Sequence, residues 1–229
     1  MAKWESDADL FAAVRKELFV AAVGDVLDKM GLLRQFVGPQ LRTIEPHMVI
    51  LGRAMPVLEA DFFEASTDGR GALSKKSFGF LFEALDDLQP GEVYICAGAS
   101  PRYALWGGLM TTRALACGAA GAVLHGYHRD TNEILRLDFP VASFGSYAQD
   151  QAPRGKVVDW RVPIELDGVR VEPGDIVFGD RDGVLIVPQH AAEAAFAGAF
   201  EKVRAENTVL EALQRGMSTA EAFKTFGVM

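Results

Sequence analysis

Apolar side chains recur at helical spacing near both ends of the chain. From about Asp7 to Met30 they form two stripes, which consist of Leu10, Phe11, Val14 and Leu18 and of Val23, Val26, Leu27 and Met30. This spacing of three and four residues is typical of an amphipathic helix, and Gly31 suits the position where a helix ends. A long helical pattern returns between about His190 and Gly216. We therefore predict helical segments near both ends.

The next part of the chain changes from an extended to a helical pattern. Met48 to Leu58 carries branched apolar residues and a glycine, which predicts a strand, whereas Phe78 to Leu88 predicts a helix that stops before Pro90-Gly91. Between them, Asp61 to Gly79 is polar and rich in glycine, with a Thr-Asp-Gly turn at its centre. We expect a mobile loop there, a candidate cover for a pocket.

A strand, a helix and a second strand are predicted between Glu92 and Gly126. EVYICAGAS is a buried strand, helical spacing runs from Leu109 to about Cys117, and GAVLHG is the next buried strand. This order favours a parallel crossover unit. Short strands follow in FPVASFG and KVVDWRVPIEL, and then Ile176–Gly179 and Val184–Val187 form two strands around an Asp-Arg-Asp-Gly turn. The pattern indicates an α/β fold in one compact domain.

Composition narrows the function classes. The chain has 229 residues, 49% of them hydrophobic and 24% charged, as in ordinary soluble globular proteins. A net charge of -8 without a basic run argues against nucleic acid as the main partner. The two cysteines suggest neither a disulfide framework nor a zinc site. Because neither a signal peptide nor an apolar stretch of membrane-spanning length is seen, we expect a cytoplasmic protein without a membrane partner.

The sequence WGGLM, Trp106 to Met110, is the first candidate site. Its two glycines lie between a strand and a helix, so that backbone N–H groups at a helix N-terminus are exposed. Such groups bind carboxylate or phosphate with the help of the helix dipole. The alternative is a tight turn in which glycine simply fits. The spacing is that of neither a P-loop nor a dinucleotide fingerprint.

Arg129 and Asp130 form the second candidate site, because they follow the second strand of the crossover at its carboxyl end. Ligands of α/β sheets gather at this edge. An arginine there can clamp a carboxylate or stabilise an enolate oxygen, and an aspartate can hold a divalent ion whose other ligands are mostly water. The alternative is an ion pair between the two side chains that caps a loop.

Other polar residues have simpler interpretations. His125 and His128 are expected to hydrogen-bond rather than to bind metal, and Asp180 and Asp182 to be turn carboxylates. His128-Arg129-Asp130 matches the kinase catalytic-loop tripeptide, but the other kinase motifs are missing.

The motifs together resemble a known family. WGGLMTTRALACGAAGAVLHGYHRD, FPVASFG and VRVEPGDIVFGDRDGVLIVP, with VGDVLDKMG and LGRAMPV upstream, resemble the 4-hydroxy-4-methyl-2-oxoglutarate aldolases and RraA-like proteins. The resemblance covers most of the chain. It implies an αββα sandwich of the RraA-like, swivelling β/β/α type, with residues 1–229 as a single domain. It also implies a homotrimer or a dimer of trimers with sites between subunits, and a C-terminal helical segment, about 190–229, at the interface.

The resemblance also implies a chemistry and a set of residues. The aldolase members of this family cleave pyruvyl-containing hydroxy acids with Mg²⁺ or Mn²⁺ and decarboxylate oxaloacetate. Arg129 would then bind the pyruvyl group and stabilise the enolate, and Asp130 would bind the metal. The turn at Gly108, with the amides of Leu109 and Met110, would hold the substrate carboxylate. A glutamate from a neighbouring subunit, Glu206 or second Glu201, would approach the metal. The expected partner is a small oxo acid.

Two departures leave an alternative open. The aldolases carry an acidic residue where this chain has Gly108, and His125-Gly126 replaces the usual Asp-Gly or Asp-Ala. RraA-like relatives without the full acidic set bind and inhibit an endoribonuclease instead of acting as enzymes. The expected function is therefore a metal-dependent carbon–carbon lyase, with a non-catalytic binding protein as the alternative. A third interpretation is a related lyase whose substrate is shaped by the loop from Ser66 to Gly79 and by His125 and His128. Tyr103 and Trp106 would then indicate a bulkier or less polar substrate, unless both are core residues.

Overall fold

A computed structural model describes residues 4–62, 71 and 73–227 of the chain. These residues group into two compact units. The larger runs from Arg34 to Gln189 and holds all the strands, whereas the smaller consists of the two terminal segments. Part of the predicted mobile loop between Asp61 and Gly79, including its Thr-Asp-Gly turn, lies outside the described residues. The organisation of residues 1–229 as a single domain stays a prediction.

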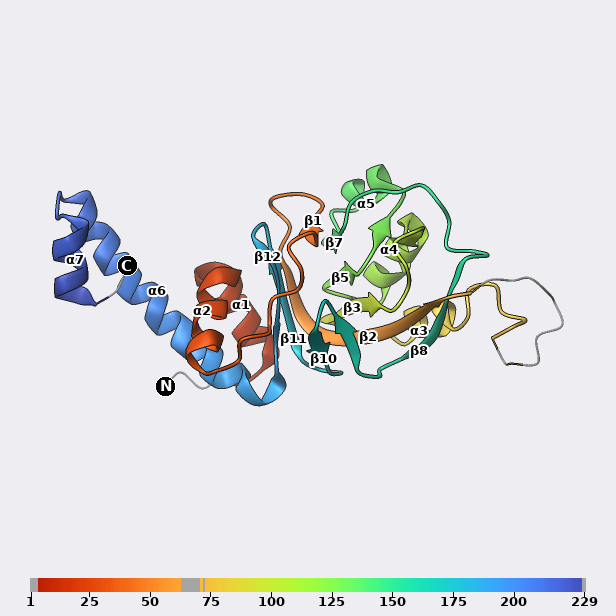
Figure 1. Ribbon diagram of the computed structural model, residues 1–229, viewed down its shortest axis with the longest axis horizontal. Coiled ribbons are helices and arrows are strands. Elements are labelled where there is room, and N and C mark those ends of the chain that lie inside the picture. Colours follow the sequence, from red (N-terminus) through yellow and green to blue (C-terminus); the bar gives the residue numbers. More distant parts are fainter. Residues whose placement is uncertain (1–3, 63–70, 72, 228–229) are drawn as a thin grey trace. The chain divides into compact units, whose positions relative to one another are not determined.

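The larger unit is built on a mixed sheet. Its strands follow the order β1-β7-β5-β3-β2-β11-β12, and β8 also pairs with β2. The bounds are β1 Arg42–Thr43, β2 Ile50–Asp61, β3 Glu92–Ala97, β5 Gly121–Leu124, β7 Val141–Ser143, β8 Gly155–Trp160, β11 Ile176–Asp180 and β12 Gly183–Val187. The neighbours β2, β3, β5 and β7 are parallel, and the outer pairings are antiparallel. Figure 1 shows the long β2 crossing this sheet.

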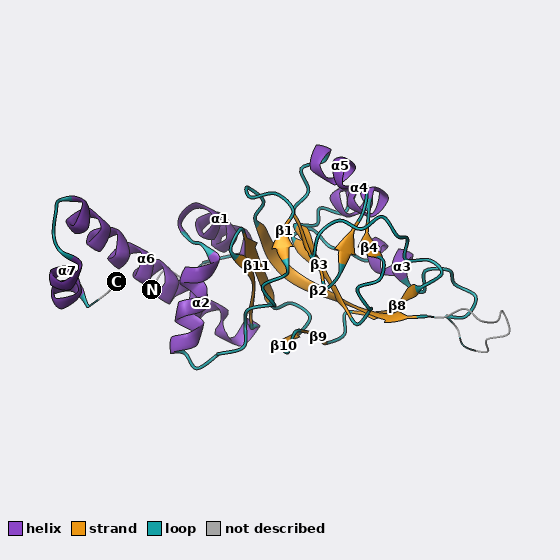
Figure 2. Ribbon diagram, turned by 45° about the horizontal axis from the view of Figure 1, so that its top comes forward, coloured by secondary structure: helices purple, strands orange, loops and turns teal. Residues whose placement is uncertain are grey.

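The sheet is covered on both faces. Helices α3 (Leu81–Asp86), α4 (Gly108–Ala116) and α5 (Thr131–Arg136) contribute to one core, and the hairpin of β9 (Ile164–Leu166) and β10 (Val169–Val171) contributes to the other. Figure 2 shows these layers on opposite sides of the strands. Residues of β3 alternate accordingly: Tyr94 and Cys96 join the helix-side core, and Val93 and Ile95 join the hairpin side. The predicted α/β class is confirmed, with parallel strands β3 and β5 joined through α4.

The smaller unit consists of helices. α1 (Asp7–Glu17) and α2 (Val20–Lys29) come from the N-terminal segment, and α6 (Ala192–Gln214) and α7 (Thr219–Phe226) from the C-terminal one. The predicted helical C-terminal segment is therefore present, with a short 3₁₀ turn, Gln189–Ala191, before α6. None of the described helices combines the length and the apolar content that a membrane crossing requires.

The helical pattern from Asp7 to Met30 is divided between α1 and α2, one for each of the two predicted stripes. Leu18 and Phe19 are both extended, with φ of -112° and -136°. The five positions from Leu18 to Val23 correspond to a rotation of about 140° around a helix axis, at about 100° per residue. A straight helix would therefore turn the two apolar stripes in different directions, and the break removes this conflict. Gly31 ends α2 with a φ of +81°, as predicted.

Candidate active site

Two short parallel strands bring the candidate residues together. β4 (Ala104–Trp106) pairs with β6 (Tyr127–His128), and each strand leads into a helix, α4 or α5. The Arg129 amide donates to the Trp106 carbonyl at 2.9 Å, which holds the two strand ends in register. The second candidate pair thus follows β6, in a separate small sheet, and not the main-sheet strand β5, which ends at Leu124. The two turns nevertheless lie together, because each follows one of these two paired strands.

The Asp130 side chain lies against the N-terminus of α4. Its Oδ2 accepts a hydrogen bond from the Gly108 amide at 3.0 Å, where the helix dipole favours negative charge. Asp130 itself is left-handed, with φ 56° and ψ 37°, directly before α5. This conformation costs a non-glycine residue roughly 1 kcal/mol or more. The surrounding structure therefore holds the carboxylate in a position that the local backbone disfavours.

Gly107 is required by this close approach. A Cβ at position 107 would lie 2.7 Å from Asp130 Oδ2, which is shorter than a carbon–oxygen contact allows. The φ of Gly107 is -157°, which any residue can adopt. The glycine is therefore needed for space beside the carboxylate, and not for backbone freedom.

Arg129 forms ion pairs with two carboxylates. Its Nε lies 3.8 Å from Asp130 Oδ2, and its Nη1 lies 3.2 Å from Asp150 Oδ1. Asp150 was not identified from the sequence. It lies in the polar loop after β7, and only the fold brings it beside a residue that is 21 positions earlier. The Arg129–Asp130 ion pair is thus present, but it is part of a three-residue group instead of an isolated loop cap.

This group lines a cavity of about 240 Å³. Arg129, Asp130 and Asp150 are its charged lining residues, and apolar side chains of α3 and of the first turn of α4 also line it. Leu109 and Met110 of the predicted substrate-binding turn are among them. Arg129 and Asp130 therefore lie in a cavity, as a functional pair requires.

The first turn of α4 presents its backbone N–H groups beside the cavity. A helix leaves these groups without intrahelical acceptors, and here the Thr111 amide is the one that reaches back to the Gly107 carbonyl, at 3.0 Å. The amide of Gly108 is taken by Asp130. The amides of Leu109 and Met110 precede Thr111 and are placed to bind an anion.

The space beside Gly108 is filled by Glu133 from α5. A Cβ at position 108 would lie 2.6 Å from Glu133 Cγ. The Glu133 carboxylate forms an ion pair with Arg136. A side chain at position 108 would therefore have to displace that of Glu133.

A buried acid lies behind the cavity wall and was also missed from the sequence. Glu59 of β2 is 1% exposed, and its Oε2 accepts a hydrogen bond at 2.7 Å from Gln151 Nε2, a residue that lines the cavity. Burial raises the pKa of Glu59 to about 8, against the opposing effect of a hydrogen bond with Cys96. The sequence feature that could have identified Glu59 is a single glutamate within an apolar strand pattern.

Several polar and aromatic residues have structural roles. His125 pairs with Asp167 at 3.0 Å, and His128 bonds Ser143 and Thr131 at 2.7 and 3.0 Å, as the hydrogen-bonding interpretation predicted. Burial lowers the pKa of His128. Asp180 accepts from the Asp182 amide within the β11–β12 turn, as predicted.

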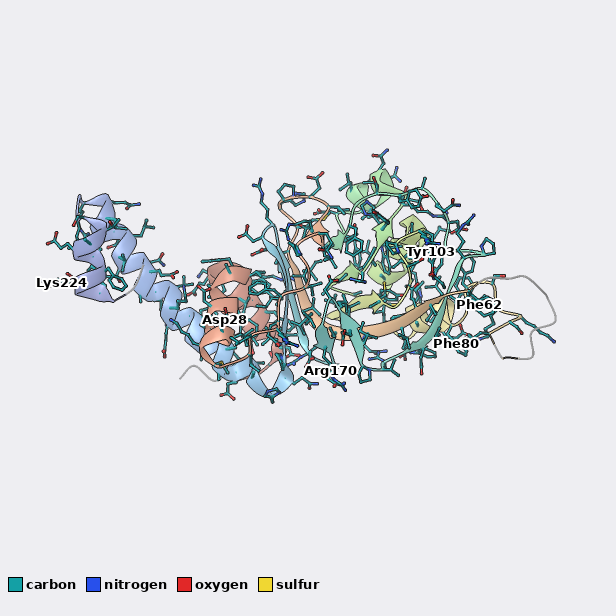
Figure 3. All side chains as sticks on the ribbon, viewed as in Figure 1. Asp28, Phe62, Phe80, Tyr103, Arg170 and Lys224 are labelled. Carbon is teal, nitrogen blue, oxygen red and sulfur yellow. The ribbon has the colours of Figure 1, made fainter. Side chains whose placement is uncertain are left out.

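Tyr103 and Trp106 are core residues, each 1% exposed. Tyr103 donates to Asp61 at 2.8 Å, and the Trp106 indole donates to Thr111 at 2.7 Å. Figure 3 labels Tyr103 within the larger unit, and Arg170 on the hairpin strand β10. Both rings are therefore core residues, and of the two Trp106 also lines the cavity beside Arg129.

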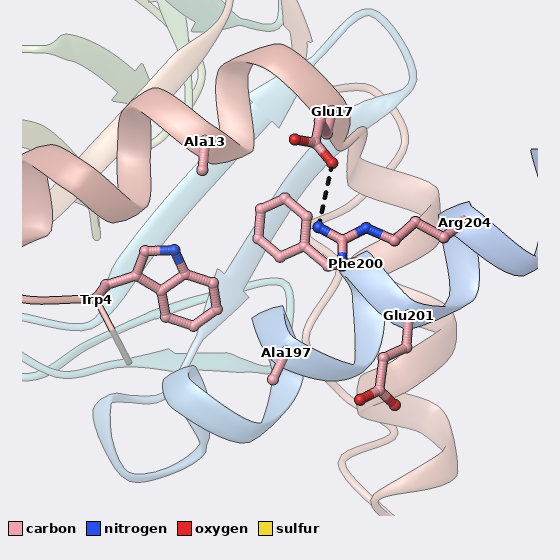
Figure 4. Close-up of a pocket in the computed structure, with 7 residues that line it drawn as sticks. All are labelled: Trp4, Ala13, Glu17, Ala197, Phe200, Glu201 and Arg204. Atoms are coloured by element: carbon pink, nitrogen blue, oxygen red, sulfur yellow. Dashed lines mark ion pairs between the residues drawn. The ribbon is translucent and has the colours of Figure 1, made fainter. Parts of the chain in front are cut away.

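The two glutamates predicted for a neighbouring subunit's metal lie on α6 in the smaller unit. Glu206 forms an ion pair with Lys202, which also contacts Asp25 at 3.0 Å. Glu201 lines a cavity of about 420 Å³ between α1 and α6, beside Phe200 and the Glu17–Arg204 ion pair at 3.7 Å (Figure 4).

The donor set around Asp130 fits a weakly ligated divalent ion. Within the described residues there is no group of three or more histidine, cysteine, aspartate or glutamate side chains that could enclose a metal. Mg²⁺ is commonly held by one or two carboxylates while waters and substrate fill its other positions. Asp130 uses Oδ2 for the Gly108 amide, which leaves Oδ1 as a ligand, so the site suits such an ion.

The amino-acid sequence is similar to parts of several known proteins. Protein DlpA of Legionella pneumophila is 37% identical over 84 residues, which are 37% of this chain and 14% of that protein. The 4-hydroxy-4-methyl-2-oxoglutarate aldolase of Thermus thermophilus is 35% identical over 109 residues, which are 47% of this chain and 65% of that enzyme. The chain thus spans less than two thirds of the length of these two relatives.

Solved structures agree on the fold. The crystal structure of Streptomyces coelicolor RraAS2, described as an unusual member of the RNase ES inhibitor RraA protein family, has a TM-score of 0.74 at 22% identity. The match covers 94% of this chain and all of that one. Residues 20–186 match the family profile described as Aldolase/RraA. This match spans most of the chain, including both turns of the candidate site, and the chain therefore belongs to the RraA-like family.

Proposed function

We propose that the protein is a divalent-metal-dependent carbon–carbon lyase that acts on a small 2-oxo acid. The observation that carries this proposal is the meeting of three features in one cavity. They are the Arg129 guanidinium, the Asp130 carboxylate on the Gly108 amide, and the first turn of α4. The aldolase named among the relatives supports the same reaction class.

The residues of the chain would bind and polarise the 2-oxo acid group of the substrate. The amides of Leu109 and Met110 hold the 2-oxo acid's carboxylate, with help from the helix dipole. Arg129 directs its N–H groups at the 2-oxo oxygen, where negative charge develops as the enolate forms. Asp150, 3.2 Å from Arg129, keeps the guanidinium oriented. Asp130 is the residue that holds Mg²⁺ or Mn²⁺, which supplies Lewis-acid polarisation of the 2-oxo acid when bound.

The reaction balances without another reactant. In a 4-hydroxy-2-oxo acid the C3–C4 bond breaks, and its electrons remain on the three-carbon fragment as the enolate of pyruvate. The 4-hydroxyl group loses its proton as C4 becomes the carbonyl carbon of the released aldehyde or ketone. The enolate then takes up a proton at C3 to give pyruvate. With oxaloacetate, the bond to the distal carboxylate breaks instead and carbon dioxide leaves, so one site serves both reactions.

Pyruvate release tests this proposal. The protein with Mg²⁺ or Mn²⁺ is incubated with oxaloacetate and with a panel of 4-hydroxy-2-oxo acids, and pyruvate is measured in a coupled assay. We expect release that a chelator abolishes and excess metal restores. Asp130→Asn serves as the control for non-enzymatic decarboxylation by free metal. Absence of turnover above that control across the panel would reject the lyase.

The alternative is a non-catalytic RraA-type protein that binds an endoribonuclease. Gly108, in place of the family's acidic residue, is the feature that favours it. In that case binding of the endoribonuclease would be unchanged in Arg129→Ala, and no 2-oxo acid would be turned over. The two functions are therefore separated by turnover of the 2-oxo acid panel and by the effect of Arg129→Ala on endoribonuclease binding.

A further inference from the structure

The cavity beside Arg129 has an apolar wall that does not take part in binding the 2-oxo acid group of the substrate. Phe78, Leu81 and Phe82 line it from α3 and the segment before it, and Leu109 and Met110 line it from α4. The rings of Phe78 and Phe82 meet edge to face with their centroids 5.6 Å apart. This wall belongs to the same cavity as Arg129, Asp130 and Asp150.

Two of these side chains are unusually exposed. Leu109 is 88% exposed and Phe82 is 62% exposed, whereas Leu81 beside them is 4% exposed. Large apolar side chains that gather at the rim of a cavity are a feature of binding sites. An apolar ligand group placed against them would remove their surface from water, which is favourable in proportion to the area covered.

The charges of the described lining residues disfavour a second anionic group on the substrate. Arg129 is the only cation among them, and it already lies beside two carboxylates, Asp130 and Asp150. A substrate with a carboxylate at each end would place its second carboxylate against phenylalanine and leucine. Desolvation of an unpaired carboxylate is costly. Such a substrate is therefore disfavoured here.

We propose that the substrate is a 2-oxo acid whose other end, beyond the bond that is cleaved, is an uncharged apolar group such as phenyl or branched alkyl. The inference rests on the proposed lyase function and narrows its substrate class. The head binds at Arg129 and the first turn of α4, and the tail packs on Phe82 and Leu109. The Thermus relative is named for a dicarboxylic substrate, so this preference distinguishes the chain from that enzyme.

Binding of three non-cleavable acids tests the preference without turnover. Pyruvate, 2-oxo-4-phenylbutanoate and 2-oxoglutarate are titrated into the Mn²⁺-loaded protein by calorimetry. We expect the phenyl acid to bind about tenfold or more tightly than pyruvate, because the ring buries apolar surface, and 2-oxoglutarate to bind no more tightly than pyruvate. Tighter binding of 2-oxoglutarate than of the phenyl acid would overturn the inference while leaving the lyase in place.

Two variants assign the effect to Phe82. Phe82→Ala is expected to remove the gain of the phenyl acid and leave pyruvate unchanged, and Phe82→Arg to create a gain for 2-oxoglutarate. The matched control is Phe36→Ala, because Phe36 is 46% exposed and does not line this cavity. If Phe82→Ala weakened all three acids equally and changed the oligomeric state, the side chain would belong to a subunit contact and the inference would fall. Failure of all three acids to bind would overturn both the lyase and its substrate class.

Discussion

Among single residues, the guanidinium of Arg129 has the largest role in the proposed lyase reaction. A lysine at this position keeps the charge but cannot present the planar set of donors that contacts Asp150 and the substrate oxygen together. We expect Arg129→Lys to lower kcat/KM for pyruvate release by about 100-fold, the effect of losing one charge-stabilising donor. Arg113→Lys is the matched control, because Arg113 of α4 pairs with the exposed Asp86 at the end of α3 and does not line the cavity. Equal activity of the two variants would contradict the role of Arg129.

Glu59 makes stability depend on pH. Its pKa in the folded protein is about 8, against an ordinary value of 4.5 for a glutamate. Between these two pH values the folded state therefore binds more protons than the unfolded state. The free energy of unfolding should therefore fall as pH rises from about 5 to about 8, by an amount on the order of 5 kcal/mol at most. Urea unfolding across this range measures the slope.

The isosteric Glu59→Gln variant is the control for this slope. Glutamine has no proton to lose, so its slope should be smaller than that of the wild-type protein over the same range. An identical slope in both proteins would show that another group is responsible.

At the scale of elements, the junction between α4 and α5 sets the position of Asp130. We expect Gly107→Ala to weaken Mn²⁺ binding at least about tenfold, because the new Cβ would collide with Asp130 Oδ2 and move the carboxylate. Mn²⁺ titration followed by electron paramagnetic resonance measures this.

Ala116→Gly, at the far exposed end of α4, is the matched control. It lowers the stability of the same helix by about 1 kcal/mol without approaching the cavity. If both variants bound Mn²⁺ as tightly as the wild-type protein, the junction would not be what positions the metal ligand.

Some of the helices, strands and turns could be predicted from the sequence, and others could not. The crossover of β3, α4 and β5 and the β11–β12 hairpin follow from local patterns, and so does the turn at Gly107. Helix α5 was not predicted, because its six residues contain few apolar positions. Asp150 and Gln151 were missed for another reason: they reach the cavity only through the path of the loop after β7, which no local periodicity encodes.

At the scale of the whole molecule, the predicted oligomer gives Glu206 its role. We expect a trimer or a dimer of trimers, with a mass in light scattering of three or six times the 24.8 kDa of one chain. In that assembly Glu206 of one chain would approach the metal held by Asp130 of another. Asp130→Asn and Glu206→Gln should each lose most of the activity.

Mixing these two chains tests the shared site. Co-expression of Asp130→Asn with Glu206→Gln creates some sites that combine an intact Asp130 from one chain with an intact Glu206 from the other. Activity should therefore recover in the mixed assembly to a fraction of the wild-type value. The control is the co-expression of Asp130→Asn with Glu211→Gln in place of Glu206→Gln. Without recovery in the mixture, the contribution of Glu206 across a subunit boundary would be rejected.

Binding of Mn²⁺ together with oxalate, which has the charge and shape of the pyruvate enolate, tests whether the cavity at Arg129 and Asp130 is the active site. Electron paramagnetic resonance should show that the wild-type protein binds Mn²⁺, and that oxalate tightens this binding and changes the spectrum. Asp130→Asn should lose the metal, and Arg129→Lys should keep the metal but bind oxalate more weakly. If Asp130→Asn bound Mn²⁺ and oxalate as the wild-type protein does, the cavity at Arg129 and Asp130 would not be the active site.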